Sequence, residues 1–115
     1  MDRTTSTETK QIPRQRWEGW CDTFTNGNRG RAVTIELVDD GMGAAPLAEG
    51  IALVAIDYDT PGKGNDIVVS YGDEATPSRH TISAPAKLLQ TQDENGAVAS
   101  LEIEDEGGRR TIVSF

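Results

Sequence analysis

The stretch IPRQRWEGWCDTF, residues 12–24, decides the fold class because helical periodicity is concentrated there. Pro13 suits the first position of a helix, where its missing N–H leaves no hydrogen bond unmade. Apolar side chains then recur at i, i+3, i+4 and i+7, which places them on one helix face. These side chains are Trp17, Trp20, Cys21 and Phe24. The segment Asn26-Gly27-Asn28 and Gly30 end the pattern, so the stretch predicts an amphipathic helix.

The two tryptophans allow two interpretations of this helix. If they are buried, they anchor the helix on the core, and removal of one costs on the order of 3–5 kcal/mol of stability. If they are exposed, they form a recognition surface with neighbouring arginines, because Trp and Arg concentrate binding energy at interfaces. We expect burial, and the candidate interaction residues are Trp17, Trp20, Arg14 and Arg16.

From residue 31 onward the apolar spacing changes to two, which is typical of strands. Turn residues separate the apolar runs, and Asn95-Gly96 is the clearest turn because this pair adopts positive φ at little cost. Residues 41–48 are small and are expected to form a loop. The runs predict six or seven short strands, at residues 33–37, 51–58, 67–71, 80–84, 88–92, 98–104 and 111–115.

One helix followed by short strands with tight connections predicts an α+β domain. We expect the helix to pack on a small antiparallel β-meander or a partly open barrel. Residues 1–11 are polar and rich in threonine, and they are expected to be a flexible lead. The remaining residues, 12–115, are expected to form a single globular domain, since 115 residues suffice for one domain with its own core.

The net charge of −8 is unevenly distributed, with +2 in residues 1–31 and −10 in residues 32–115. A field of this sign repels phosphate backbones, so no direct nucleic-acid binding is expected. The single cysteine excludes an internal disulfide, and the polar N-terminus is not a secretory signal. No apolar run approaches the roughly 20 residues that span a bilayer. We therefore expect a cytoplasmic protein that does not engage a membrane.

Cys21 and His80, the single Cys and His, are the candidate pair for nucleophilic catalysis. Cys21 falls on the apolar helix face, where a free thiol acts as a small hydrophobe. No sequence motif of a cysteine hydrolase surrounds either residue. We therefore predict no catalytic residues and no cofactor.

Three aspartates in DYDTPGKGND, namely Asp57, Asp59 and Asp66, are weak candidates for calcium ligands. The helix-loop-helix calcium motif fails because Pro61 takes the third ligand position and Val68 stands where the closing glutamate belongs. The flanking residues also read as strands. We therefore predict a solvated turn and no metal site.

The order and spacing of several short motifs resemble a family of short bacterial proteins of unknown function. The motifs are Ile12-Pro13 with Trp17, Val33-Thr34-Ile35-Glu36, Gly50-Ile51, Leu88–Asp93, Asn95-Gly96, Leu101-Glu102-Ile103-Glu104, Gly107 and Phe115. The resemblance covers residues 12–115 and implies that they form one domain. It implies no activity and no site residues.

Three classes of function remain open. A non-enzymatic protein-interaction or accessory domain is preferred, with a protein partner or a second copy docking at an open sheet edge. An acidic decoy or inhibitor of a nucleic-acid-binding protein is the first alternative, based on the −10 balance after residue 31. A small enzyme that uses Cys21 and His80 is the second.

Overall fold

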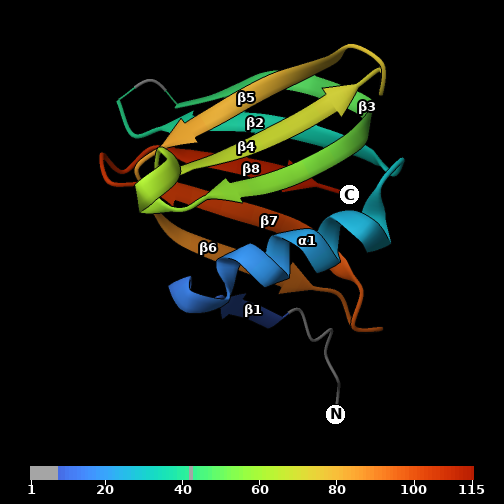
Figure 1. The fold of residues 1–115 in the computed structure, drawn as a ribbon. Coiled ribbons are helices and arrows are strands. Elements are labelled where there is room, and N and C mark those ends of the chain that lie inside the picture. The colour runs from blue at the N-terminus through green and yellow to red at the C-terminus, as the bar shows by residue number, and fades with distance from the viewer. Residues whose placement is uncertain (1–7, 42) are drawn as a thin grey trace.

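A computed structural model describes residues 8–41 and 43–115, and it shows one helix packed on an eight-stranded antiparallel sheet (Figure 1). The predicted α+β class is confirmed. In chain order the elements are β1 (Glu8–Gln11), η1 (Arg14–Arg16), α1 (Trp17–Asn28), β2 (Ala32–Asp39), β3 (Gly43–Asp59), η2 (Pro61–Lys63), β4 (Asp66–Gly72), β5 (Pro77–Ser83), β6 (Pro85–Gln92), β7 (Val98–Asp105) and β8 (Arg110–Ser114). The strand order across the sheet is β1-β6-β7-β8-β2-β3-β4-β5.

The helix forms with the predicted apolar face. Trp17, Cys21 and Phe24 are buried, and Trp20 is partly buried against the same core. The start of the helix differs from the prediction, because Pro13 keeps an extended conformation with φ −60° and ψ 140°. The single turn η1 follows it, and α1 begins only at Trp17.

The long strand β3 is the main difference between the predicted and observed sheets. Residues 41–48 were expected to form a loop, but the 17 residues Gly43–Asp59 form one strand. The first half of β3 pairs with β2 and its second half pairs with β4. This strand therefore turns the sheet on itself, and β4 and β5 lie across the face of β2 and β8 (Figure 1).

The core lies between the two parts of the sheet and beneath α1. Its strand residues are Val33, Ile35, Leu53, Ile56, Ile67, Val69, Ile82, Leu88, Leu101, Ile103 and Val113. Leu37 and Ile51, which belong to the apolar runs of the predicted strands 33–37 and 51–58, are only partly buried. Leu37 follows Val33 and Ile35 on the inward face of β2, but it lies beyond the part of that face that the core covers.

An eighth strand, β1, occupies the C-terminal end of the predicted flexible lead. Glu8–Gln11 pair with residues 89–92 of β6. Residues 8–11 of the expected flexible lead, residues 1–11, therefore form a strand instead. The hydroxyls of Thr9 and Thr91 also meet across the pair at 2.9 Å. The rest of the predicted lead, residues 1–7, lies outside the described residues.

Two strands end the sheet, and each has one partner in the described part of the chain. β1 pairs with β6, and β5 pairs with β4. The first half of β3 likewise pairs with β2 alone. The described sheet is therefore open along β1, along β5 and along the start of β3. No described helix is long and apolar enough to cross a membrane.

Candidate functional site

Trp17 and Arg14, two of the candidate interaction residues, make structural contacts. Trp17 is 1% exposed, and its indole Nε1 donates a hydrogen bond of 2.8 Å to the carbonyl of Ile12. The Arg14 guanidinium lies 4.3 Å above the Trp17 ring and donates to the carbonyl of Pro85 at 2.7 Å. Both side chains therefore hold the N-terminal end of the helix against the sheet.

The other two candidates on this stretch remain accessible to solvent. Trp20 is partly exposed and stacks on Phe24 with ring centroids 5.0 Å apart. Arg16 is exposed at the end of η1. The four residues do not form one continuous exposed surface, because Trp17 lies inside the core.

Cys21 and His80 are placed in different environments. Cys21 is fully buried on α1, and burial together with the nearby charges of Asp57 and Asp22 raises its pKa to about 12. Such a thiol is protonated at neutral pH and is a poor nucleophile. His80 lies on β5 and lines a cleft that does not include Cys21 among its lining residues.

The three candidate calcium ligands are dispersed over two strands. Asp57 and Asp59 on β3 line a groove of about 660 Å³ together with Glu18, Asp22 and Glu74, which we call the acidic groove. Asp66 on β4 is the cross-strand partner of Asp59, and it is not among the residues that line the groove. Among the described residues, no group of three or more His, Cys, Asp or Glu is arranged to hold a metal ion.

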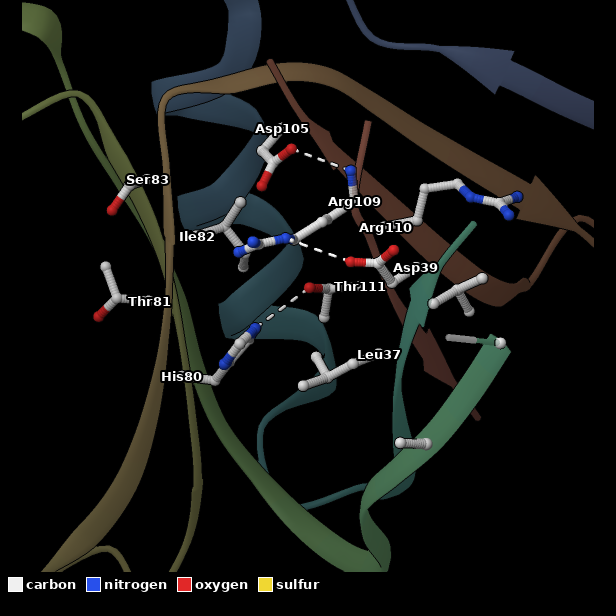
Figure 2. A pocket seen from close by; sticks show the side chains of 13 residues that line it. Leu37, Asp39, His80, Thr81, Ile82, Ser83, Asp105, Arg109, Arg110 and Thr111 are labelled. Carbon is white, nitrogen blue, oxygen red and sulfur yellow. Dashed lines mark hydrogen bonds and ion pairs between the residues drawn. The ribbon is translucent and has the colours of Figure 1, made fainter. Parts of the chain in front are cut away.

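A cleft of about 510 Å³ that the sequence did not predict lies beside β5 (Figure 2). It opens where β5 passes over the end of β2 and the starts of β8 and β3. We call it the β5 cleft, and the lining residues that matter here are Leu37, Asp39, Gly43, Ala45, His80, Ile82, Arg109 and Thr111. It is the outer end of the core, where the inner face of β2 is left uncovered.

The floor of the β5 cleft consists of two rows that cross the strands. In the first row, Leu37 is paired with Ala45 on one side and Thr111 on the other. Two residues further along β2, Asp39 is paired with Gly43, and the Nε of Arg109 lies 3.4 Å from its carboxylate. The cleft therefore has an apolar row beside a charged row.

His80 reaches from β5 to the apolar row. Its ring Nε2 lies 3.2 Å from the Thr111 hydroxyl, and Figure 2 shows the ring directed toward Thr111 and Leu37. Burial lowers the pKa of His80 below its ordinary value of 6.5, so the ring is neutral at neutral pH. The polar contact in the floor of the cleft is thus uncharged.

The wall of the cleft formed by β5 is largely main chain. Thr81 and Ser83 line the cleft, yet their side chains point away from it in Figure 2. The N–H of Ala84 donates to the carbonyl of Asn65 at 3.0 Å, so Ala84 and Asn65 are a hydrogen-bonded pair at the end of the β4–β5 ladder. Because hydrogen-bonded and non-bonded pairs alternate in antiparallel ladders, His80 and Ile82 bond toward β4. The N–H and C=O groups of Thr81 and Ser83 face the open edge.

The geometry is complemented by one match to a protein family. The family is described as "Family of unknown function (DUF5335)", and it matches residues 8–115, from the start of β1 to the last residue. The chain belongs to this family. The DUF5335 match includes the four residues of β1 that the sequence-based domain boundary left out.

A relative of this DUF5335 chain is found in Aquifex aeolicus (strain VF5). It is 29% identical over 105 residues, which cover 91% of this chain and 89% of the relative, and it is described as an uncharacterized protein. No solved structure matches the chain. The predicted membership of a family of unknown function is confirmed, and the comparisons attach no activity to it.

Proposed function

We propose that this domain is a non-catalytic protein-interaction module that binds an extended segment of a partner protein along β5. The observation that carries the proposal is the open main-chain edge of Thr81 and Ser83 beside an apolar cleft. In strand addition, main-chain hydrogen bonds supply affinity, and pockets for alternate side chains supply specificity. The β5 cleft offers both, because the open main-chain edge of β5 lies directly beside the pocket.

The His80–Thr111 contact supports binding better than catalysis. Thr111 is only 4% exposed, so its hydroxyl is not presented to a substrate as a nucleophile. Within the described chain, the hydrogen bond found for the His80 ring is the one to Thr111, and no carboxylate orients the ring. A nucleophile, a base and a group that orients the base are the usual minimum for this chemistry.

A different protein is a better occupant of the edge than a second copy. Each copy carries a net charge of −8, so two copies repel each other at low ionic strength. A flexible segment from another protein can reach both the edge and the cleft floor.

The acidic groove favours a second candidate function. Five carboxylates from α1, β3 and the turn after β4 line a hollow on the outer face of β3 and β4. This surface suits a basic protein and agrees with the acidic decoy considered from the sequence. It supports the decoy through charge alone, whereas the β5 cleft combines a main-chain edge with an apolar floor.

The proposal is tested with a displayed library of short linear peptides selected on the wild-type domain. Thr81→Pro removes an edge N–H without touching the β4 ladder, because Pro is tolerated where the N–H faces away from the neighbouring strand. Thr9→Pro is the matched control. The Ile12 N–H donates to the Leu88 carbonyl, and because hydrogen-bonded and non-bonded pairs alternate along the β1–β6 ladder, the Thr9 N–H faces the open side of β1.

Selected peptides should lose binding to Thr81→Pro and keep it for Thr9→Pro. Thermal melts of both variants should show that the domain stays folded. Failure to select any peptide, or equal binding to both variants, would contradict the proposed function.

A further inference from the structure

The two rows of the β5 cleft are spaced like alternate residues of a bound strand. The step from Leu37 to Asp39 on β2 is matched by the step from Ala45 to Gly43 on β3. The cleft-facing residues of β5, His80 and Ile82, are also two residues apart. Alternate side chains of a strand are roughly 6.6 Å apart and point to the same side. One side chain of an inserted strand would therefore face each row.

The apolar row fits an aliphatic side chain. Leu37 and Ala45 supply carbon surface, and the neutral His80–Thr111 pair supplies no net charge. A charged side chain placed here would lose its hydration without gaining an opposite charge, which is unfavourable. The partner residue opposite His80 should therefore be of the valine or leucine type.

The charged row fits a carboxylate, because the Arg109 side chain is accessible and weakly held. The Arg109 backbone is fixed in the turn after β7, where its N–H donates to Asp105 Oδ1 at 3.0 Å and its carbonyl accepts from the Asp105 N–H at 2.9 Å. Its side chain is 76% exposed, and its ion pair with Asp39 is made by Nε at 3.4 Å. Exposed pairs of this kind contribute little and are easily exchanged.

Figure 2 shows the Arg109 side chain extending from the turn between β7 and β8 into the cleft toward β5. The other guanidinium nitrogens are then free to bind a planar carboxylate through two parallel hydrogen bonds. A second acid that lines the cleft, Asp105, has its Oδ1 occupied by the backbone N–H groups of Gly107 and Arg109. The overall negative charge acts from a distance and is screened beyond roughly 8 Å at physiological salt.

We propose that the β5 cleft recognises a partner segment in which an Asp or Glu precedes an aliphatic residue by two positions. Arg109 binds the carboxylate, and Leu37 and Ala45 receive the aliphatic side chain. Figure 2 shows Ile82 on the side of Arg109 and His80 on the side of Thr111. In a strand added antiparallel to β5, the residue beside Ile82 precedes the residue beside His80, so the carboxylate comes first. This inference rests on the proposed function, since it presumes that the segment pairs with β5.

The test uses two capped, threonine-rich synthetic peptides that differ in one group. The acid peptide carries Glu and, two residues later, Val, and the amide peptide carries Gln in place of Glu. Binding of each is measured by calorimetry to wild type, Arg109→Gln, Asp39→Asn and Arg79→Gln. Arg79 lies on β5 but lines the acidic groove on the opposite face of that strand. Arg79→Gln therefore controls for the change in net charge.

The acid peptide should bind wild type about threefold to tenfold more tightly than the amide peptide, as expected for one exposed charge-assisted contact. Arg109→Gln should remove this preference, and Arg79→Gln should retain it. Asp39→Asn should strengthen binding of the acid peptide, because it releases Arg109 from its own carboxylate partner.

Equal binding of the two peptides to wild type, or a preference that survives Arg109→Gln, would overturn the inference. If both peptides bind equally and Thr81→Pro weakens both, only the carboxylate assignment fails. If neither peptide binds and the display experiment yields no β5-dependent peptide, the proposed function fails with it. Binding of neither peptide while displayed peptides bind through β5 also counts against the inference.

Discussion

Thr25 on α1 bonds both backbone groups of Ile56 on β3 through a single hydroxyl. Its Oγ1 donates to the Ile56 carbonyl and accepts from the Ile56 N–H, each at 3.0 Å. Arg29 Nε adds a bond of 3.3 Å to the carbonyl of Val54 on the same strand. The helix thus satisfies the edge of β3 that β4 leaves unpaired, whereas no described element does the same for Thr81 on β5.

Replacing Thr25 with Val should destabilise the domain by about 1–3 kcal/mol, the cost of leaving buried donors and acceptors without partners. Thr25→Ser keeps the hydroxyl and should retain most of the stability. Urea unfolding of the two variants compares them directly. Equal stability of Thr25→Val and wild type would show that the hydroxyl does not hold the helix on β3.

The two tryptophans should differ in fluorescence. Trp17 is 1% exposed and Trp20 is partly exposed, so the variant Trp20→Phe reports on a buried indole and Trp17→Phe on a wetter one. Emission of Trp20→Phe should be blue-shifted and poorly quenched by iodide. Emission of Trp17→Phe should be at longer wavelength and more readily quenched. The reverse order would contradict the burial of Trp17.

Cys21 should react slowly with a thiol reagent in the native state and at an ordinary rate after denaturation. Burial and two nearby carboxylates raise its pKa from 9.0 to about 12, so the thiolate is scarce. Because the folded pKa is raised, the thiol's contribution to stability is complete below pH 9 and is lost as the pH rises toward 12. The slope of unfolding free energy against pH above 9 should be smaller in Cys21→Ala. Rapid native labelling would contradict this account.

His80 should titrate below its ordinary pKa of 6.5, because burial disfavours the imidazolium. The folded pKa is lowered, so His80 contributes stability above pH 6.5 that is lost as the pH falls through the folded value. His80→Gln should reduce the loss of stability in this range, and NMR titration of the ring gives the pKa itself. A pKa at or above 6.5 in the folded protein would exclude burial as the controlling factor.

The elements with buried side chains were predictable from the sequence, and those without them were not. The 3.6-residue spacing of Trp17, Cys21 and Phe24 gave the helix face, and the two-residue spacing of Val33 and Ile35 gave a strand. β1 and the first half of β3 expose almost all of their side chains, so neither leaves an apolar pattern. Main-chain pairing with β6 and β2 creates them.

The β5 cleft could not be predicted because it depends on how β3 folds the sheet on itself. His80 and Thr111 are 31 positions apart and carry no motif that would bring them together. One signal did exist in the sequence. Leu37 continues the apolar alternation of β2, and the structure leaves it partly exposed at the cleft floor.

The central claim is that β5 is the edge that accepts a partner strand, and amide hydrogen exchange with and without a selected peptide tests it most directly. In the free protein the amides of Thr81 and Ser83 should exchange quickly, because their N–H groups face the open edge. A bound peptide should slow one or both of them and leave Thr9 and Gln11 on the β1 edge unchanged. Protection that appears on β1 or α1, with Thr81 and Ser83 still exchanging quickly, would contradict the account.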